Sequence, residues 1–334
     1  VEVTLLEANA AGWGCAGRNA GFVLPGSGRL GYGALKKAYG EDAATGIIGE
    51  FYQAPENLRA LIQQEQLDVD MAAGGYLKIA HKSAHFDNFT QQYDELPNQF
   101  KTHLKLVDQE ELAGELLQIK QQFGGLYNSS SFGINPLKMA TAMAELLSKV
   151  GGIIHHNSPV TEYRKDGNHY KVVTPQGEVT CDKVVLATNA YTPNRSLPVF
   201  YGIQFPVLSS ILVTHPLEEE QLACFKQEGI LCMDTRALKY YYRLLPDNRV
   251  LFGGRGAIAG RNHASQAIKN KLLGALKSSF PSLSDARIDY FWSGWVSVSQ
   301  DEIPHIGALP NEPDVFYAMG YCGSGVALSL IHIS

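Results

Sequence analysis

The feature that most constrains the fold of this chain is a glycine-rich turn close to its end. Residues 320–326 read Gly-Tyr-Cys-Gly-Ser-Gly-Val, and they follow the apolar run from Val315 to Met319. Glycine is favoured where the backbone takes a positive φ or lies close against a ligand. The segment therefore predicts a strand that ends in a tight turn, which is either an ordinary loop or one side of a ligand site.

A second glycine-rich segment, residues 12–21, lies near the start of the chain and also follows a strand-like run. That run, residues 1–7, is mostly apolar and β-branched, as in a buried parallel strand. The glycine-rich loop contains Arg18 and Asn19, so it can direct backbone N–H groups and a guanidinium at an anion. Two such turns far apart in the sequence suggest that one large ligand lies between them.

Glu7 ends the first strand-like run. An acid at the end of the second strand of a dinucleotide-binding βαβ unit accepts hydrogen bonds from ribose hydroxyls. A solvated carboxylate at a strand end is the alternative. The first strand and the GxGxxG turn of such a unit do not occur ahead of Glu7, and Val1 begins inside the strand. We therefore expect the chain to be a fragment.

The α/β pattern continues in the middle of the chain. A helix is expected after Asn135-Pro136, followed by a strand that includes Val160. The adjacent His155 and His156 of that strand point to opposite faces, so no metal site is expected. A fully apolar strand at residues 183–191 ends in small and polar residues, and ligands bind at the carboxyl ends of such strands. An ordinary strand exit is the alternative.

A β-rich block interrupts this pattern. Residues 205–298 contain hairpins, an aromatic strand and one helix after Ser265, whereas residues 83–120 are polar and expected to be mostly helical. The α/β pattern resumes at Val315. We therefore expect an α/β fold, α+β overall, with a Rossmann-like cofactor domain and an inserted antiparallel-sheet substrate domain. The cofactor domain comprises residues 1–72, 133–196 and 299–334, and the substrate domain comprises residues 73–132 and 197–298.

Composition excludes several classes of protein. The net charge is -5 with lysine and arginine dispersed, so there is no basic surface for nucleic acid. No apolar run approaches the length of a membrane span. The five cysteines are scattered without a CxxC motif, which predicts neither a zinc site nor a disulfide framework and favours a cytoplasmic location.

The order of these motifs resembles that of a known family. A strand ending in glutamate leads to Gly-Trp-Gly-Cys-Ala-Gly-Arg-Asn-Ala-Gly, then Val-Val-Leu-Ala-Thr-Asn, Asp-Glu-Ile-Pro-His-Ile-Gly and the final glycine turn. This order resembles the FAD-dependent amine oxidoreductases of the D-amino-acid-oxidase superfamily. The nearest likeness is to the γ-glutamylputrescine oxidase-like branch, with sarcosine and glycine oxidases as relatives. The resemblance covers nearly the whole chain.

The resemblance implies a set of residues around FAD. Glu7 resembles the ribose ligand, and the backbone at Val160 resembles the segment that meets adenine. The loop around Arg18 resembles the part near the diphosphate and flavin, and the turn at Gly320 resembles the one that closes on the flavin. The implied cofactor residues are Glu7, Ala8, Gly14, Ala16, Gly17, Arg18, Asn19, Val160, Ala187, Thr188, Asn189, Gly320, Gly323, Gly325 and Val326.

The chain departs from the family pattern at several positions. Cys15, Ala16 and Ala20 replace Ala, Ser and Gly of the usual loop, and Ser324 replaces the usual His. The stretch from Trp292 to Asp301 contains no cysteine, so we expect noncovalent FAD; the roles of Cys322 and Ser324 stay open. Residues 250–252 contain no lysine where related oxidases place one beside the flavin. That absence leaves open whether oxygen is the electron acceptor.

The resemblance implies oxidation of a C–N bond in a primary or secondary amine or amino acid. A hydride passes to FAD N5, the imine hydrolyses, and oxygen is the expected acceptor. The alternatives are a dehydrogenase using a quinone or protein acceptor, and a non-catalytic flavin-binding module or truncated relic. The expected substrate residues are Tyr241, Arg243, Trp292 and Trp295, each of which has plain packing on a sheet as its alternative. Because side chains alternate along a strand, only one of Tyr240 and Tyr241 faces the flavin.

Overall fold

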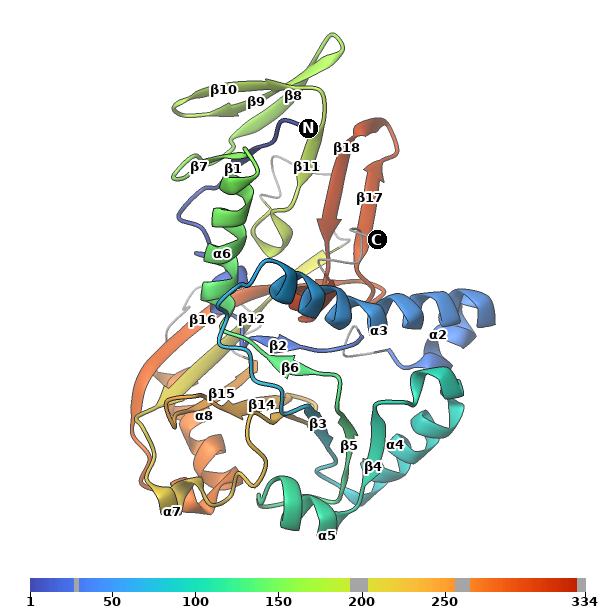
Figure 1. Ribbon diagram of the computed structural model, residues 1–334, viewed down its shortest axis with the longest axis vertical. Helices are drawn as coiled ribbons and strands as arrows, with labels where there is room; N and C mark the ends of the chain where they lie inside the picture. Colours follow the sequence, from blue (N-terminus) through green and yellow to red (C-terminus); the bar gives the residue numbers. More distant parts are fainter. Residues whose placement is uncertain (27–29, 193–203, 256–264, 329–334) are drawn as a thin grey trace.

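The structure is a computed structural model that describes residues 1–26, 30–192, 204–255 and 265–328. One large sheet forms the lower half of the molecule, and three small sheets stand above it (Figure 1). The large sheet has the strand order β16 (Ile288–Ser299), β12 (Gln204–Thr214), β15 (Val250–Arg255), β14 (Tyr240–Leu244), β13 (Leu231–Asp234), β3 (Tyr76–Ile79), β5 (Gly125–Asn128), β4 (Leu104–Val107). Neighbouring strands are antiparallel except β13 and β3, which are parallel.

One face of this sheet is covered by α8 (Gln266–Ser279), with the short α7 (Glu219–Leu222) and η5 (Pro281–Leu283) beside it. The hydroxyl of Ser265 accepts a hydrogen bond from the Ile268 N–H at 3.3 Å and caps α8. Leu272 and Leu276 lie one turn apart and pack into the core beneath the sheet. This face is therefore closed by apolar packing.

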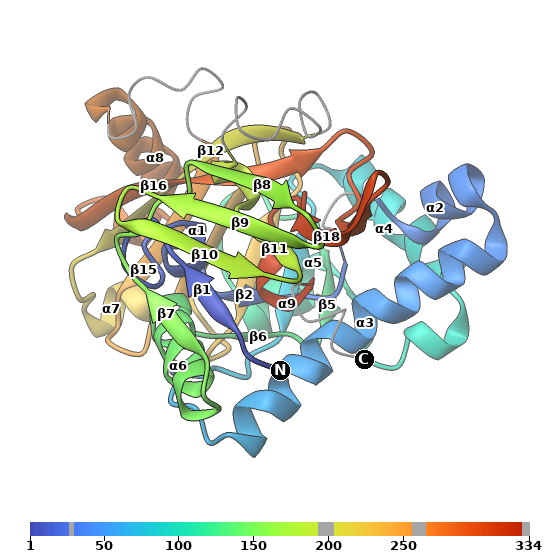
Figure 2. The same cartoon turned by 90° about the horizontal axis from the view of Figure 1, so that it is seen from above.

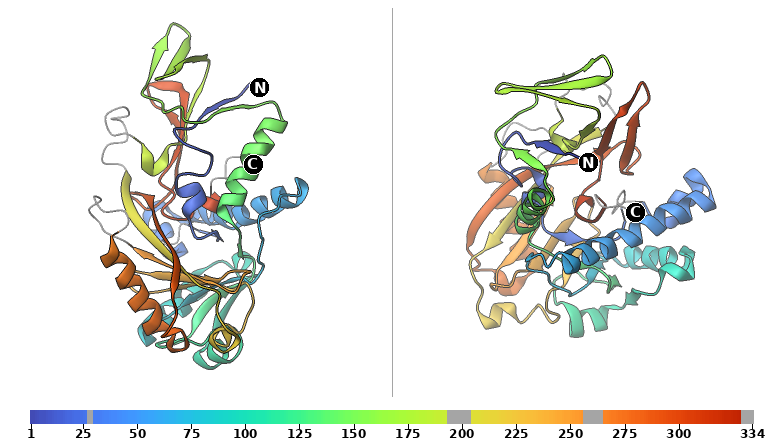
Figure 3. Two further views of the ribbon diagram at one scale, coloured as in Figure 1. Left: turned by 90° about the vertical axis from the view of Figure 1, so that its left-hand side faces the viewer. Right: turned by 45° about the horizontal axis from the view of Figure 1, so that its top comes forward.

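Helices lie on the other side of the large sheet. α2 (Tyr32–Tyr39), α3 (Glu41–Gln64) and α4 (Ser83–Glu95) form this group, and Figure 3 shows α3 and α8 on opposite sides of the strands. A second core packs around α3 and includes Phe51 and Leu58, one face of that helix. The two-stranded pair β2 (Phe22–Val23) and β6 (Phe132–Gly133) lies between α3 and the sheet (Figure 1).

The small sheets carry the remaining strands. β1 (Thr4–Leu6) is parallel to β7 (Ile153–His155), and β11 (Val184–Leu186) is parallel to β18 (Glu312–Met319), which pairs with β17 (His305–Leu309). β8 (Glu162–Asp166), β9 (His169–Thr174) and β10 (Gly177–Cys181) form an antiparallel meander that overlies the others in Figure 2. Elsewhere the chain forms the helices α1 (Cys15–Arg18), α6 (Pro136–Lys149) and α9 (Gly325–Leu328) and the 3₁₀ turns η1 (Asn98–Phe100) and η3 (Asn189–Tyr191).

Local signals placed most elements correctly. Asn135 caps α6 as expected, because its side-chain oxygen accepts from the N–H groups of Leu137 and Lys138, each at 3.2 Å. The hairpin of β14 and β15 and the strand before Gly320 are also confirmed. The overall class, a mixed α/β fold with one large, mostly antiparallel sheet, is confirmed as well.

Two expectations are wrong, and a third missed a strand. Helical turns make up most of residues 83–120, as expected, but β4 occupies Leu104–Val107 within that range, and only short turns follow it, α5 (Gln109–Glu111) and the π-helix η2 (Leu112–Leu116). The strand β4 is stabilised by its pairing with β5, and the local sequence does not reveal that partner. Val160 lies in the connection between β7 and β8 and not in a strand. β11 is shorter than expected, and Val185 within it is 68% exposed.

Among the helices of the described residues, none is both long enough and apolar enough to cross a bilayer. All five cysteines, at positions 15, 181, 224, 232 and 322, are free thiols.

Candidate active site

A cavity of about 350 Å³ lies between the glycine-rich segments and the face of the large sheet opposite α8. We call its two sides the turn wall and the sheet wall. The turn wall is α1 with the loop around it, residues 12–21, together with residues 320–326. The sheet wall is the set of side chains that β3, β5, β12, β13, β14 and β16 direct into the cavity. Residues of α2, α3 and α4 close the cavity on the remaining side.

Close backbone packing shapes the first part of the turn wall. A Cβ on Gly17 would lie 2.2 Å from the Gly12 carbonyl oxygen and 3.0 Å from Leu137 Cδ1. Asn19 braces the loop internally: its Nδ2 donates to the carbonyl oxygens of Cys15 and Ala16, and its Oδ1 accepts from the Gly21 N–H at 2.7 Å. Glycine is therefore needed here for close approach, and Asn19 fixes the loop while lining the cavity.

Arg18 lies at the end of α1 and lines the cavity. Its guanidinium stacks 4.6 Å from the centre of the Trp13 ring, and Nη1 donates to the Ser293 carbonyl oxygen at 3.5 Å. The carbonyl oxygen of Arg18 accepts from the indole N–H of Trp292 at 2.8 Å. Trp292 thus fastens α1 to β16; it is not among the residues that line the cavity, which corrects the expectation that it contacts substrate.

Positive φ angles shape the second part of the turn wall. Gly320, Cys322 and Gly323 have φ of 76°, 54° and 97°, so the chain reverses sharply after β18. The Gly320 N–H donates to Asn189 Oδ1 at 3.1 Å, and the Cys322 N–H donates to the Ser297 carbonyl oxygen at 2.9 Å. These bonds hold the turn between η3 and β16. Gly323 and Val326 line the cavity, whereas Gly320 and Gly325 are not among its lining residues.

The register of β12 and β16 decides which side chains reach the cavity. Val207 lies opposite Val296 and Ser209 lies opposite Gly294, and these four residues all line the cavity. Trp295 lies opposite Leu208, and each is one residue away from the cavity-lining residues of its strand. Because side chains alternate along a strand, both point to the other face of the sheet, where Leu208 is buried. The expectation that Trp295 contacts substrate is therefore wrong.

Tyr241 is the tyrosine of β14 that faces the cavity. Its hydroxyl lies 2.7 Å from Ser209 Oγ, and burial raises the pKa of Tyr241 well above its usual value. Its ring covers Gly253, where a Cβ would come within 2.0 Å of the ring. Tyr240 and Tyr242 point the other way and pack on Phe252 in the core, with ring centres 5.2 and 5.6 Å from its ring centre. Of Tyr240 and Tyr241, it is therefore Tyr241 that faces the cavity.

Arg243 does not reach the cavity. Its Nη2 donates to the Ile134 carbonyl oxygen at 2.7 Å, and the guanidinium lies so near β6 that a Cβ on Gly133 would be 2.3 Å from Nη1. Burial lowers the pKa of Arg243 to about 10. The expectation that Arg243 binds a substrate carboxylate is therefore wrong, because the side chain is used inside the fold.

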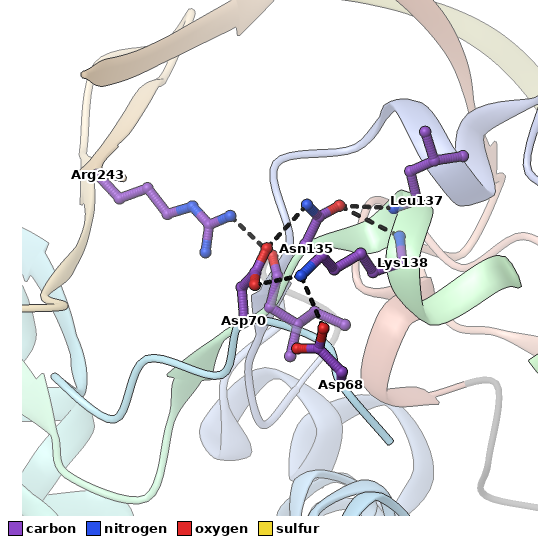
Figure 4. A network of polar contacts seen from close by, with 7 residues as sticks. Asp68, Asp70, Asn135, Leu137, Lys138 and Arg243 are labelled. Atoms are coloured by element: carbon purple, nitrogen blue, oxygen red, sulfur yellow. Dashed lines mark hydrogen bonds and ion pairs between the residues drawn. The ribbon is translucent and has the colours of Figure 1, made fainter. Parts of the chain in front are cut away.

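Figure 4 shows where Arg243 points. It approaches a polar network in which Lys138 Nζ donates to Asp70 Oδ1 at 2.6 Å and to Asp68 Oδ2 at 2.9 Å. Asn135 Nδ2 donates to Asp70 Oδ2 at 3.1 Å. The hydrogen bond from Lys138, with smaller contributions from Asn135 and Arg243, lowers the pKa of Asp70. This network ties the start of α6 to the segment before β3.

Several cavity residues could not be found from the sequence. Tyr76 and Lys78 of β3, Leu126 and Asn128 of β5, and Met233 of β13 all line the cavity. The alternation in Tyr-Leu-Lys-Ile separates Tyr76 and Lys78 from the core residues Leu77 and Ile79. That alternation predicts which face of the strand each side chain lies on, but a lysine on such a face is ordinarily in contact with solvent. The face becomes part of the cavity wall because β3 pairs in parallel with β13.

The remaining residues expected around FAD form a connected path above the cavity. The Ser158 N–H donates to the Glu7 carbonyl oxygen at 2.8 Å, which brings Val160 near the end of β1. A Cβ on Gly14 would lie 3.3 Å from the Tyr191 ring, so α1 adjoins the segment from Ala187 to Tyr191. Asn189 then bonds to Gly320. Ala8, Ala16, Ala187 and Thr188 are exposed.

This path fits FAD. Glu7 supplies a carboxylate at the end of a parallel strand, its Oε1 accepting from the Asn9 N–H at 2.9 Å. Arg18 supplies a cation at the turn wall, and the cavity leaves space beside both glycine-rich turns. Val160 is 39% exposed and offers apolar surface near Glu7. An elongated ligand with hydroxyls, negative charge and a flat apolar ring matches these groups in that order.

The comparisons with known proteins agree with this arrangement. The family model described as FAD dependent oxidoreductase (DAO) matches residues 1–332. Gamma-glutamylputrescine oxidoreductase of Escherichia coli (strain K12) is 28% identical over 325 residues, covering 97% of this chain and 74% of the relative. A probable oxidoreductase, OrdL, of Haemophilus influenzae is 29% identical over 332 residues, covering 98% and 74%. Glycine oxidase of Geobacillus kaustophilus is 22% identical over 285 residues, covering 82% and 71%.

Solved structures show the same fold. The crystal structure of the Geobacillus kaustophilus glycine oxidase superposes with a TM-score of 0.80 at 18% identity, covering 98% of this chain and 85% of that one. L-proline dehydrogenase of P. horikoshii superposes with a TM-score of 0.79, also at 18% identity, covering 99% and 84%. The expected family and cofactor are confirmed: the chain belongs to the DAO family of FAD-dependent oxidoreductases.

Proposed function

We propose that the chain oxidises a C–N bond in a primary or secondary amine or amino acid and that the resulting imine hydrolyses to a carbonyl compound and an amine. The observation that carries this proposal is the cavity between the turn wall and the sheet wall, which is mostly apolar and aromatic with a few polar groups. Relatives named as acting on γ-glutamylputrescine and glycine support the substrate class. Bound FAD supplies the redox chemistry by accepting a hydride, or its equivalent, at N5.

The turn wall is proposed to hold the cofactor without a covalent bond. Arg18 is charged and lines the cavity, so it can face the diphosphate or the flavin, while Glu7 binds the ribose hydroxyls. The turn that contains Gly323 closes on the flavin ring. We propose in addition that residues 1–72, 133–196 and 299–334 form the cofactor domain and that residues 73–132 and 197–298 form the substrate domain.

The sheet wall is proposed to position the amine. Among the described residues that line the cavity, the charged ones are Arg18, Lys78 and Lys239, and none is an aspartate or a glutamate. Positive surroundings lower the pKa of an amine, so the cavity favours the neutral form. A neutral amine can lose a hydride from its carbon without a catalytic base. Tyr241 and Ser209 offer hydroxyl groups that accept or donate a hydrogen bond to the nitrogen.

Oxygen is proposed as the electron acceptor, and a quinone or a protein is the rival. Residues 250–252 contain no lysine, and Val250 and Phe252 are packed in the core. This departure from the pattern of related oxidases favours the quinone or protein acceptor. Release of hydrogen peroxide during aerobic turnover separates the two. A rate of peroxide release equal to the rate of amine consumption supports oxygen, whereas consumption that requires an added quinone supports the rival.

The proposed reaction is tested by anaerobic titration of the FAD-loaded chain. The panel comprises γ-glutamylputrescine, glycine and N-methylglycine, with butane as an apolar control that lacks nitrogen. We expect at least one amine to bleach the visible absorbance of the flavin in a stoichiometric reaction. Bound flavin that none of the amines reduces, although a chemical reductant does, would instead identify a flavin-binding module without turnover.

A further inference from the structure

The cavity extends along the sheet wall far beyond the turn wall. Arg18 and Gly294 line one end, and Lys78 and Asn128 line the other. In the sheet order, β3, which carries Lys78, lies five steps from β16, which carries Gly294. At about 4.8 Å per step, these strands are roughly 24 Å apart along the sheet surface. An amine with only two or three carbon atoms is too short to contact both ends at once.

Lys78 is an unusual residue to find at the distal end. It lies on β3 between two core residues, Leu77 and Ile79, and its Nζ approaches the ring of Phe89 in α4 at 5.3 Å from the centre. Burial lowers the pKa of Lys78 to about 8, and repulsion from Lys239 adds to the effect. No carboxylate contributes to that shift. An ammonium in such a place is unfavourable unless a ligand supplies the counter-charge.

Asn128 adds a second donor at the same end. Its Oδ1 accepts from the Ser130 N–H at 2.9 Å, and this bond fixes the orientation of the amide. Its Nδ2 is buried and has no hydrogen-bond partner among the described residues. In the register of β3 and β5, Asn128 lies opposite Tyr76 and Leu126 lies opposite Lys78. Asn128 and Lys78 are therefore diagonal neighbours on one face of the sheet.

We propose that Lys78, with Asn128 beside it, forms a distal subsite that binds a carboxylate carried by the substrate far from the carbon that is oxidised. The inference rests on the proposed amine oxidation and names its substrate class: extended amines with a remote carboxylate. An ammonium and an amide N–H together match the two oxygens of one carboxylate. The cavity-lining residues described here include no acid that would repel it.

The main test compares two amines that differ only in this group. γ-Glutamylputrescine carries the remote carboxylate, and 4-aminobutanoylputrescine is the same molecule without it. For the wild-type chain loaded with FAD, we expect at least a tenfold preference for the acid in anaerobic flavin reduction. Lys78→Met should abolish the preference by raising KM for the acid and leaving the analogue unchanged. Lys82→Met removes an exposed lysine close by in the sequence and should retain the preference.

A binding measurement gives a readout that does not depend on turnover. γ-Glutamylbutylamine keeps the carboxylate and lacks the amine to be oxidised. Calorimetry in buffers of different ionisation enthalpy should show tight binding with proton uptake at pH 8, because the carboxylate favours charged Lys78. Lys78→Met should bind at least tenfold more weakly and take up no proton. Lys78→Arg should keep the binding and lose the proton uptake, and it also guards against a folding defect in the methionine variant.

The outcomes separate the two proposals. If amines reduce the flavin but Lys78→Met leaves the preference and the binding unchanged, the distal subsite is wrong and the reaction stands. If γ-glutamylbutylamine binds through Lys78 but no amine reduces the flavin, the reaction is wrong and the subsite stands. If Lys78→Met raises KM by the same factor for the acid and for its analogue, the distal subsite is also wrong.

Discussion

The turn wall and the sheet wall face the same cavity and are built by different means. In the turn wall, glycine allows either a close approach, as at Gly17, or a reversal with positive φ, as at Gly320 and Gly323. In the sheet wall, alternate side chains of rigid strands project into the cavity, as Tyr241 does. A wall of backbone presents the same groups whatever its side chains are, which suits a constant cofactor. A wall of side chains can vary, which suits a particular substrate.

The largest effect is expected from filling the turn wall. Gly17→Ala would place a Cβ 2.2 Å from the Gly12 carbonyl oxygen, and backbone cannot move aside as a side chain can. We expect a loss of about 3 kcal/mol in the free energy of unfolding and loss of FAD from the purified protein. Denaturant unfolding and the ratio of visible to protein absorbance measure the two effects.

Gly274→Ala is the matched control. Gly274 lies in α8, and nothing lies within 4 Å of a Cβ built there. We expect an unchanged or slightly higher free energy of unfolding, by up to about 1 kcal/mol, and full FAD content. A Gly17→Ala variant as stable as Gly274→Ala would contradict the close packing inferred for the turn wall.

Removing the cation of the turn wall should weaken cofactor binding. Charge-assisted hydrogen bonds contribute about 1.5–3 kcal/mol, so we expect Arg18→Ala to raise the Kd for FAD by about tenfold or more. The melting temperature of the apoprotein should change little. Arg164→Ala, which removes an exposed arginine from β8, should leave the Kd unchanged. An unchanged Kd in Arg18→Ala would remove Arg18 from the cofactor site.

A change in the sheet wall should affect the amine and spare the cofactor. Tyr241→Phe removes the hydroxyl that lies 2.7 Å from Ser209 Oγ. A hydrogen bond contributes about 0.5–1.5 kcal/mol net, so we expect kcat/KM for the best amine to fall by about two- to tenfold. The Kd for FAD should stay the same. A variant that loses FAD and keeps its amine kinetics would show that Tyr241 serves the cofactor and not the amine.

The smallest effect concerns pH and Lys78. Its pKa is lowered from 10.5 to about 8 in the folded protein, so the unfolded chain binds more protons between those values. Burying the Lys78 ammonium lowers the free energy of unfolding by its full amount below pH 8, and this loss disappears as pH rises through 10.5. Lys78→Met should therefore melt about 2 °C above the wild type at pH 7, and the gap should close by pH 10.5. A variant that melts lower at pH 7 would show that the ammonium is compensated in the fold.

The sequence predicted the turn wall better than the sheet wall. The glycines, Arg18 and the cap at Asn135 act through neighbours in the chain, so their pattern is visible locally. The order of these motifs was enough to predict the family, which the match over residues 1–332 confirms.

The sheet wall depends on pairings between distant segments. The face on which Lys78 lies follows from alternation, but its use follows from the parallel pairing of β3 with β13, more than 150 residues away. Arg243 lies on the same face of β14 as Tyr241. The structure shows that its guanidinium instead packs against β6 and donates to the Ile134 carbonyl oxygen. Trp292 likewise looks like a pocket residue until its hydrogen bond to Arg18 is seen.

The most direct test of the account is a crystal structure of the chain with FAD and γ-glutamylbutylamine. The flavin ring is expected to lie against residues 320–326 and Arg18, with the ligand along the sheet wall between Tyr241 and Lys78. A flavin ring that lies instead against Lys78 and Asn128, at the far end of the cavity, would contradict the division between a cofactor wall and a substrate wall.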